Sequence, residues 1–346
     1  MAQMIGFDGT WPSVAVVGCG SWGSNWVRVL DRLGALSLVC DHDRGALRQV
    51  GGMAPSCRQV RSLARVLDSE VDAVVLATPA DSHFRLARRA LVAGKDVLVE
   101  KPLALDCRAG AELVRLAAER GRMLMVGHLL EYHPAILELR ELIASGVLGE
   151  LRYLHSSRLN RGTVRAGENV LWSLAPHDAA IVLRLVGELP HEVSATGGSF
   201  VRSGVADVAT THLSFPSGVR ADVFVSWFFP FKQQRLVVIG SKKTASFDDV
   251  SRQLMIYDRP LGTRQEPSLS SRDEGELRPF DSAEPLALEA AAFLEAVRDR
   301  KSPLADGRSG LAVLELLEAA QQSMAVGGTP IPLGAQAAVA TTMRAE

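Results

Sequence analysis

The 346-residue sequence contains no long run of apolar residues and no excess of charge of one sign. No segment approaches the roughly 18 apolar residues that a membrane-spanning helix needs. Lysine and arginine total 38 and aspartate and glutamate total 39, a balance that suggests neither a nucleic-acid-binding surface nor an acidic tail. Residues 1–12 have no basic segment and no apolar core, so no signal peptide is expected. These absences predict a cytoplasmic protein that binds neither nucleic acid nor membranes.

Cysteine is scarce as well, and its few copies lack the spacing of metal ligands. The sequence has neither Cys-x-x-Cys nor His-x-x-x-His, so we expect no metal site. Free thiols of this kind are typical of cytosolic proteins. The four cysteines are Cys19, Cys40, Cys57 and Cys107.

Lysine is rare, with six copies against 32 arginines. One of the six, Lys101, stands between Glu100 and Pro102 at the end of a predicted strand. An ammonium group beside a substrate hydroxyl would stabilise a developing alkoxide and could relay a proton. The alternative is a surface lysine that pairs with Glu100.

The first third of the chain alternates short apolar runs with helical segments. Such continuous apolar strands, separated by helices, predict a parallel sheet covered on both faces, the doubly wound Rossmann arrangement. Strands are predicted at 13–17, 36–40, 73–77, 96–99 and 123–126, and helices at about 22–33, 60–68, 81–94 and 104–121.

The pattern changes after about residue 127. A helix at 134–145 precedes a series of alternating strands, which predicts one large, open, mostly antiparallel sheet. We therefore expect an α/β protein with a dinucleotide-binding domain at 1–127 and a substrate-binding and oligomerisation domain at 128–346. The expected later elements are strands at 151–159, 192–197, 208–215, 219–227 and 236–239, an exposed loop at 260–284, and helices at 286–300 and 308–326.

Three glycines follow the first predicted strand with the spacing Gly-x-Gly-x-x-Gly and open the first helix. In this context Gly18 makes a tight turn, Gly20 lets the backbone approach a pyrophosphate, and Gly23 lets helix and strand pack closely. The helix N-terminus then offers N–H groups and a positive dipole end to the phosphates. The alternative is a purely structural glycine turn.

Asp41 follows the second predicted strand, 23 residues after Gly18. A carboxylate there accepts hydrogen bonds from the adenosine ribose hydroxyls and repels a 2′-phosphate, which favours NAD over NADP. Arg44 leaves NADP open, because an arginine nearby could meet a 2′-phosphate. A solvated aspartate in a turn remains the other interpretation.

Thr78 and Pro79 end the strand at 73–77, on the sheet edge where open α/β sheets bind their ligands. They are expected to lie along the nicotinamide half of the cofactor. His83 begins the next helix, where it could contact the cofactor or only cap and pack.

Pro176 predicts the first turn of a helix that runs to about residue 186 and stops at Gly187. His177 would then lie in that first turn, where the helix dipole keeps its imidazole neutral. A neutral imidazole can take the proton from a hydroxyl as hydride leaves carbon. Asp178 could orient a ring or bind the substrate, and a structural histidine is the alternative.

A dense polar cluster precedes this histidine. It suits a polyhydroxylated or phosphorylated ligand, because arginine matches phosphate and carboxylate groups, although a solvated loop would have the same composition. The cluster comprises Arg158, Asn160, Arg161, Arg165, Glu168 and Asn169, and Trp172 follows it.

With these residues identified, the chain resembles the Gfo/Idh/MocA family, named for glucose-fructose oxidoreductase and inositol dehydrogenase. The resemblance covers nearly the whole length, and its Glu-Lys-Pro signature is specific. It implies a Rossmann domain, an α/β domain with a large open sheet, and dimers or tetramers packed through that sheet. The motifs that carry it are 18–23, 77–79 with His83, 94–102 and the segment that ends at His177-Asp178.

Within the family, the segments 127–134 and 158–178 look most like the branch that oxidises the 3-hydroxyl of UDP-N-acetylglucosamine. Many members carry aspartate four residues before the histidine, whereas this chain has Ser173, which weakens any role for a carboxylate there. The resemblance implies an NAD-dependent dehydrogenase acting on a secondary ring hydroxyl of a nucleotide-linked hexosamine.

His177 and Lys101 are the expected catalytic residues. The expected substrate contacts are Arg158, Asn160, Arg165, Trp172 and Asp178. The expected cofactor contacts are Gly18, Gly20, Ser21, Trp22, Gly23, Asp41, Thr78, Pro79, His83, Glu100 and Lys101. Three alternatives stay open: a ketoreductase or imine reductase of secondary metabolism, an inositol or sugar-phosphate dehydrogenase, and a non-catalytic NAD-binding sensor.

Overall fold

The structure, a computed structural model, describes residues 10–162, 168–258 and 275–334. The chain divides into two compact units. The first comprises residues 1–133 and 283–314, and the second comprises 134–282 and 315–346. The expected boundary at residue 127 lies close to the first division, but a C-terminal segment returns to the first unit. The Arg28–Glu284 ion pair is part of that return, and a contact across 256 positions leaves no local sequence pattern.

The first unit is built on a six-stranded parallel sheet with the order β3-β2-β1-β4-β5-β6. Apolar residues fill β1, β4 and β6, and all four positions of each of these strands are buried, as expected for a sheet covered on both faces. The strands are β1 (Val14–Val17), β2 (Leu36–Cys40), β3 (Arg58–Val60), β4 (Ala73–Leu76), β5 (Asp96–Glu100) and β6 (Leu124–Gly127).

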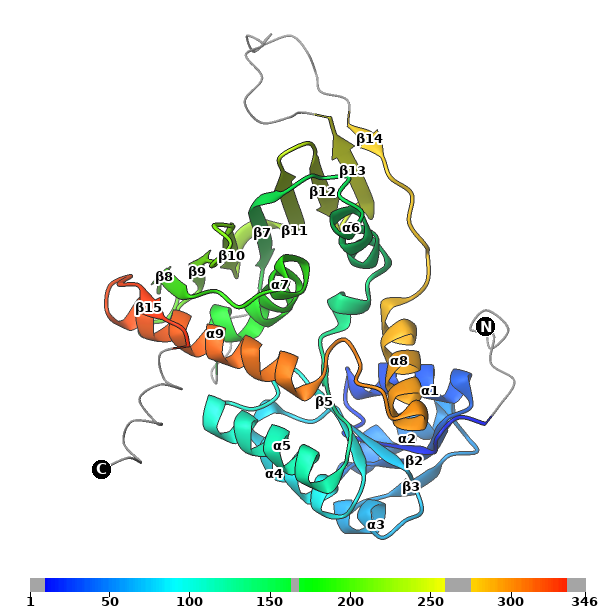
Figure 1. The fold of residues 1–346 in the computed structure, drawn as a ribbon. Coiled ribbons are helices and arrows are strands. Elements are labelled where there is room, and N and C mark those ends of the chain that lie inside the picture. The colour runs from blue at the N-terminus through cyan, green and yellow to red at the C-terminus, as the bar shows by residue number, and fades with distance from the viewer. Residues whose placement is uncertain (1–9, 163–167, 259–274, 335–346) are drawn as a thin grey trace, which may run out of the picture. The chain divides into compact units, whose positions relative to one another are not determined.

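Helices cover this parallel sheet. In Figure 1, α4 and α5 lie side by side on one side of it, and α8 packs against α1 on the other. The helices of this unit are α1 (Gly23–Leu33), α2 (Arg44–Met53), α3 (Leu63–Leu67), α4 (Ala80–Val92), α5 (Cys107–Arg120), the 3-10 helix η2 (Leu129–Tyr132) and α8 (Pro285–Asp299). Helix α9 (Gly307–Ala325) begins in this unit and ends in the second.

Two short elements of the first unit are absent from the prediction. Helix α2 begins after Asp43, whose carboxylate caps it by accepting hydrogen bonds from the backbone N–H groups of Gly45 (2.8 Å) and Ala46 (3.4 Å). Strand β3 occupies the start of the segment predicted as a helix at 60–68, so only α3 remains of that helix. The strand has three residues, too few for a periodic pattern to appear.

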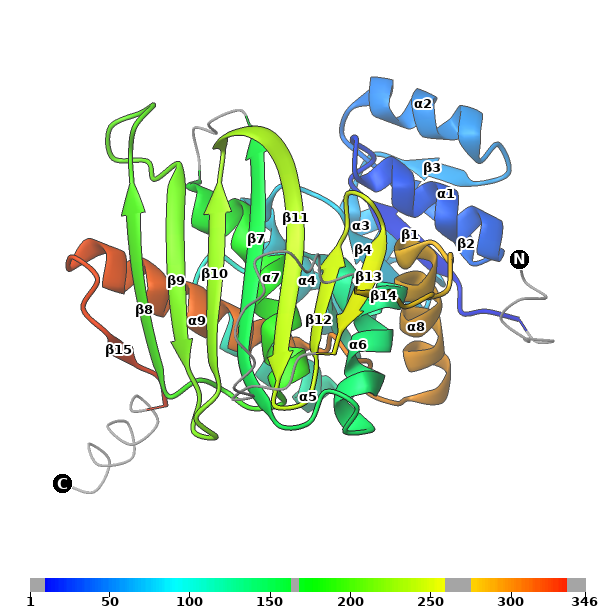
Figure 2. The same cartoon turned by 90° about the horizontal axis from the view of Figure 1, so that it is seen from above.

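The second unit contains a nine-stranded sheet with the order β14-β13-β12-β11-β7-β10-β9-β8-β15, and Figure 2 shows most of these strands side by side. Its pairings are antiparallel except between β7 and β10. The strands are β7 (Leu151–Arg161), β8 (Glu192–Gly198), β9 (Val208–Ser214), β10 (Arg220–Ser226), β11 (Phe228–Gly240), β12 (Thr244–Asp248), β13 (Gln253–Tyr257), β14 (Glu276–Leu277) and β15 (Ile331–Pro332). The α/β fold class, with a Rossmann domain and a mostly antiparallel sheet, is therefore confirmed.

Helix α7 (Val170–Val186) packs on one face of this sheet against β7, β9 and β10, and α6 (Pro134–Ala144) packs against α7. The prediction that Pro176 lies in the first turn of α7 is wrong. Asn169 caps the helix by accepting from Trp172 N (3.2 Å), so the helix begins at Val170 and Pro176 lies inside it. His177 is therefore about two turns from the N-terminus, beyond the first turn in which the helix dipole acts on a side chain.

Most of the predicted loop at 260–284 lies outside the described residues, although Glu276–Leu277 form β14. Among the described helices, none combines the length and the apolar character needed to cross a membrane.

Candidate functional site

The carboxyl edge of the parallel sheet holds a cavity of about 420 Å³. It lies where the loops after β1, β2 and β4 meet, the place where open α/β sheets bind nucleotides. Gly18, Gly20, Asp41, Thr78 and Pro79 line it, so the structure brings together five residues predicted from the sequence.

The three glycines of the turn have different surroundings. A Cβ on Gly18 would lie 2.5 Å from the carbonyl oxygen of Ala77, and one on Gly23 would lie 1.8 Å from that of Gly18. A Cβ on Gly20 would meet no protein atom within 4 Å. Gly18 and Gly23 are thus required by close packing inside the protein, whereas the surface of Gly20 stays open toward the cavity. This arrangement fits a dinucleotide pyrophosphate beside Gly20.

Asp41 connects the end of β2 to the glycine turn. Its Oδ2 accepts a hydrogen bond from the backbone N–H of Cys19 (2.7 Å), and its Oδ1 accepts one from that of Asp43 (2.9 Å). These bonds fix the carboxylate at the wall of the cavity, as binding of adenosine ribose hydroxyls would require.

Five polar residues lining the cavity were missed from the sequence: His42, Arg61, Asp81, Ser82 and Arg85. Arg61 donates to the carbonyl oxygen of His42 (3.2 Å) and follows Val60, the last residue of β3. Its position after a strand was the available signal, but that strand was not recognised.

His83 is buried, and both of its ring nitrogens face carbonyl oxygens. Nδ1 lies 2.7 Å from the oxygen of Pro102, and Nε2 lies 2.8 Å from that of Thr78. Burial lowers the pKa of His83, whereas the two carbonyl oxygens favour its protonated form. The ring thus joins the loops after β4 and β5, which favours the packing role over a cofactor contact.

Glu100 is buried at the end of β5 and holds two indole groups. Its Oε1 accepts from Nε1 of Trp26 (2.7 Å) and from Nε1 of Trp22. Its Oε2 lies 3.2 Å from the backbone nitrogen of Lys101, which donates to it. Burial raises the pKa of Glu100, and the two tryptophan bonds oppose that rise. The carboxylate therefore positions the segment before Lys101 and is already occupied by protein donors.

Lys101 follows β5 directly, and β4 lies between β5 and the glycine-bearing β1 in the sheet. Its backbone joins Pro102 through a cis peptide bond. Ser21 lies in the glycine turn, and Trp22 beside it is 42% exposed.

In the second unit, Arg158 and Asp178 contact each other. Arg158 Nε donates to Asp178 Oδ2 (2.7 Å), Arg158 Nη2 lies 3.3 Å from Oδ1, and Ser156 Oγ donates to Oδ1 (2.6 Å). Both charged side chains are almost fully buried. The pair ties β7 to α7 next to His177, which favours a positioning role over direct substrate contact.

The remaining predicted substrate residues are placed differently. Asn160 lies near the end of β7, and its buried Oδ1 has no hydrogen-bond partner among the described residues. Trp172 is half-buried in the first turn of α7, and His177, five residues further on, is half-buried as well. Arg165 lies outside the described residues.

A second cavity, of about 400 Å³, lies at this end of the nine-stranded sheet. Its walls combine aromatic faces with one cation and one carboxylate. Asp207 is fully buried; its Oδ2 accepts from the backbone of Phe200 (2.8 Å) and Val201 (2.7 Å), and its Oδ1 has no described partner. The lining residues are Arg161, Gly162, Val201, Asp207, Trp227, Phe228 and Pro230.

Within the described ranges, no three His, Cys, Asp or Glu side chains gather in a way that could hold a metal ion.

Comparison with known proteins supports the same two-unit organisation. Residues 13–128 match the family described as "Oxidoreductase family, NAD-binding Rossmann fold", and residues 136–246 match the "GFO/IDH/MocA C-terminal domain". The chain belongs to the GFO/IDH/MocA oxidoreductase family. This GFO/IDH/MocA member thus has an NAD-binding Rossmann domain.

Individual relatives of this GFO/IDH/MocA protein differ in activity. The chain is 32% identical over 302 residues to UDP-N-acetylglucosamine 3-dehydrogenase of Acidithiobacillus ferrooxidans, covering 86% of this chain and 93% of that one. A solved structure of that enzyme has a TM-score of 0.82 with 29% identity, over 91% of this chain and 98% of its own. Inositol 2-dehydrogenase 2 of Saccharopolyspora erythraea is 33% identical over 61% of this chain and 65% of its own. A 2,7-anhydro-N-acetylneuraminate hydratase of Escherichia coli is 27% identical over 67% of this chain and 66% of its own.

Proposed function

We propose that this protein is a cytoplasmic, NAD-dependent dehydrogenase that oxidises a secondary ring hydroxyl of a nucleotide-linked hexosamine to a ketone. The C3 hydroxyl of UDP-N-acetylglucosamine is the proposed target. The observation that carries the proposal is Lys101 at the end of β5, on the same sheet edge as the open glycine turn. A ligand at that edge meets both a dinucleotide cradle and a cationic hydrogen-bond donor.

The proposed reaction removes a hydride from carbon and a proton from oxygen. When bound, NAD supplies the acceptor for the hydride. Lys101 would donate a hydrogen bond to the substrate oxygen and stabilise the negative charge that grows on it. His177 would accept the hydroxyl proton as general base. Asp178 follows His177 directly, and its ion pair with Arg158 would hold the helix that carries this base.

The cavity of the second unit supports a nucleotide-linked substrate. The exposed Phe228 offers a flat face of the kind on which nucleobases stack, and Arg161 offers a guanidinium of the kind that binds phosphate. Similarity to the UDP-N-acetylglucosamine enzyme over most of both chains supports the same substrate class. A free inositol would leave such a cavity unused.

The decisive experiment measures NADH formation with a panel of UDP-N-acetylglucosamine, other nucleotide sugars, free inositols and sugar phosphates. An aminotransferase that consumes the ketone should be included to pull the reaction forward. We expect turnover with UDP-N-acetylglucosamine and a loss of about 10²- to 10⁴-fold in kcat for His177→Gln and Lys101→Met. If only free inositols are oxidised, the substrate is a cyclitol and the proposed nucleotide-sugar substrate is wrong. Full activity of both variants would refute the assigned roles.

The cofactor choice needs its own comparison, because Arg61 and Arg85 line the nucleotide cavity together with Asp41. The Asp41 carboxylate would repel a 2′-phosphate, so kcat/KM should be higher with NAD than with NADP. Asp41→Ser should reduce the difference between kcat/KM with NAD and kcat/KM with NADP. A higher kcat/KM with NADPH in the direction of ketone reduction would instead favour the reductase alternative.

The family resemblance also suggests a homodimer or homotetramer packed through the open sheet. An aromatic cluster supports this proposal: the rings of Phe229 and Phe231 lie 5.2 Å apart at their centroids, and Phe224 lies 6.1 Å from Phe229. Phe231 is 57% exposed. Light scattering should give a molar mass larger than that of one chain, and the Phe231→Ser variant should have a smaller molar mass than the wild type. A monomeric wild type would contradict the proposal.

A further inference from the structure

A third cavity, of about 560 Å³, lies at the amino edge of the parallel sheet. Asp96 begins β5, Asp72 directly precedes β4, and Pro12 and Arg122 lie two residues before β1 and β6, whereas the nucleotide cavity lies at the strands' carboxyl ends. Its volume is in the range of small-molecule sites. All the residues that line this cavity belong to the first unit.

Two of the charges in this cavity neutralise each other. Arg300 donates from Nη1 to Asp96 Oδ2 (2.6 Å) and from Nη2 to Oδ1 (3.1 Å), and Nη2 also donates to the carbonyl oxygen of Gly121 (2.7 Å). The Asp96 side chain is 3% exposed. This bidentate pair is a fixed wall of the cavity and offers little charge to a ligand.

Arg122 is in a different state. Its side chain makes no hydrogen bond or ion pair with the residues that the structure describes, and its Nε is buried without an acceptor. Leaving a buried donor unsatisfied is unfavourable, and more so for a charged group. An anion in the cavity would pair with the Arg122 side chain, which lines it and carries a positive charge.

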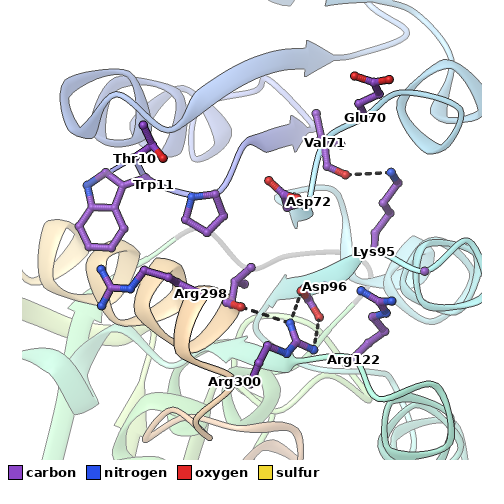
Figure 3. Close-up of a pocket in the computed structure, with 13 residues that line it drawn as sticks. Thr10, Trp11, Glu70, Val71, Asp72, Lys95, Asp96, Arg122, Arg298 and Arg300 are labelled. Atoms are coloured by element: carbon purple, nitrogen blue, oxygen red, sulfur yellow. Dashed lines mark hydrogen bonds and ion pairs between the residues drawn. The ribbon is translucent and has the colours of Figure 1, made fainter. Parts of the chain in front are cut away.

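Lys95 stands on the same side of the cavity as Arg122 (Figure 3). Its ammonium group donates to the carbonyl oxygens of Ser69 (2.7 Å) and Val71 (2.8 Å). An ammonium group has three N–H bonds, so one donor remains for a ligand. Together the two side chains make one cationic corner.

The rest of the cavity would not suit a bare anion. Asp72 uses Oδ2 to hold the backbone N–H of Ser13 (2.7 Å) and its hydroxyl (2.9 Å), and Glu70 lies nearby. Carboxylates repel anions but accept hydrogen bonds from hydroxyl groups. On the far side, the Arg298 guanidinium lies 5.0 Å from the centre of the Trp11 ring, and Figure 3 shows this pair across the cavity from Lys95.

We propose that this cavity is a second binding site, remote from the hydride chemistry, for a phosphorylated sugar. The phosphate would lie in the corner formed by Arg122 and Lys95. The sugar hydroxyls would donate to Asp72 and Glu70, and the C–H face of the sugar ring would rest toward Trp11. The proposal depends on the first unit only and stands apart from the identity of the oxidised substrate.

The test is calorimetric titration of the full chain, saturated with NAD, with three probes: glucose 6-phosphate, glucose and inorganic phosphate. We expect glucose 6-phosphate to bind more tightly than either of the others. Arg122→Gln should weaken its binding by about 10- to 100-fold, the loss expected for a charge-assisted hydrogen bond. Arg122→Lys, which keeps the charge, should restore part of that loss.

Arg120→Gln is the matched control, because Arg120 is exposed at the end of α5 and does not line the cavity. It should bind glucose 6-phosphate as the wild type does, and all three variants should unfold at wild-type temperatures. Binding that is unchanged in Arg122→Gln would place the probe elsewhere and overturn the proposal. An absence of binding by glucose 6-phosphate would overturn it equally.

Discussion

Arg158 Nε lies 2.7 Å from Oδ2 of Asp178, in a buried ion pair that joins β7 to α7. Asp178 directly follows His177 on α7. The sequence predicted both side chains as substrate contacts because each is polar and close to the expected base. Their burial indicates instead that the charges are used inside the protein. A fixed α7 would orient the His177 imidazole, so a residue can matter to catalysis without touching the substrate.

Removing one partner of this pair should destabilise the protein strongly. Asp178→Ala leaves the Arg158 guanidinium buried and unpaired, a change that costs about 3–5 kcal/mol in comparable sites. Urea unfolding measured by circular dichroism should show this loss in the free energy of unfolding. An unchanged midpoint would mean that solvent reaches the arginine.

The double variant Arg158→Met, Asp178→Leu separates the contribution of the ion pair to stability from its role in positioning His177. It removes both charges, and apolar replacements of buried pairs are often neutral or stabilising. We therefore expect it to recover most of the stability lost in Asp178→Ala while kcat stays low and KM changes little. Wild-type kcat in the double variant would exclude a positioning role for the pair.

Substitutions in the glycine turn can distinguish an effect on folding from an effect on cofactor binding. Gly20→Ala adds a methyl group that meets no protein atom, so its melting temperature should match the wild type. The same methyl group would occupy the space where a pyrophosphate approaches, so the Kd for NAD should rise at least about tenfold, or roughly 1.4 kcal/mol. Calorimetric titration with NAD measures this change.

Gly23→Ala is the matched contrast. Its Cβ would stand 1.8 Å from the carbonyl oxygen of Gly18, so helix and strand would have to move apart. Overpacking of this kind costs about 1–3 kcal/mol or more. We expect a lower melting temperature for this variant. Equal stability and equal NAD affinity in both variants would contradict the assignment of the turn.

The nucleotide cavity could be predicted from the sequence because each of its parts is local. A glycine spacing after an apolar strand, a carboxylate at the next strand end and a threonine at a third all lie on one edge once the strands are parallel. Strand topology alone thus assembles Gly18, Asp41 and Thr78, without knowledge of any side-chain contact.

The parts that were missed depend on contacts or caps that the pattern does not contain. Pro176 predicts a helix start, but capping by Asn169 extends α7 by six residues, which alters the position of His177 in the helix. The return of α8 to the first unit depends on contacts with α1 across more than 250 positions, such as Arg28–Glu284. Neither the burial of Arg158 nor its pairing can be inferred from composition.

Thiol chemistry offers a test of the burial of the glycine turn. Burial raises the pKa of Cys19 to about 12, and the pKa values of Cys40 and Cys57 to about 11. Because only the thiolate reacts, these three should resist a disulfide reagent at pH 8. Cys107 is half-exposed and should react, giving one labelled thiol per native chain and none in Cys107→Ser. Rapid labelling of Cys19 would show that the turn opens.

Glu289 on α8 predicts how stability depends on pH. Its side chain is fully buried, neither oxygen has a hydrogen-bond partner among the described residues, and α8 packs against α1 and η2. Burial, followed by the nearby carboxylates of Glu100 and Glu131, raises the pKa of Glu289 well above its ordinary value of 4.5. The folded protein therefore keeps a proton that the unfolded chain releases once the pH passes 4.5.

The free energy of unfolding of the wild type should consequently fall as the pH rises from about 4.5 toward the raised pKa of folded Glu289, by about 1.4 kcal/mol for each tenfold drop in proton concentration within this range. Glu289→Gln resembles the protonated side chain and cannot ionise. The variant and the wild type should therefore have similar free energies of unfolding near pH 5, and the variant should be the more stable at pH 8. Urea unfolding of both proteins across this range measures the difference. A difference that does not change with pH would mean that Glu289 releases its proton equally in the folded and unfolded chains.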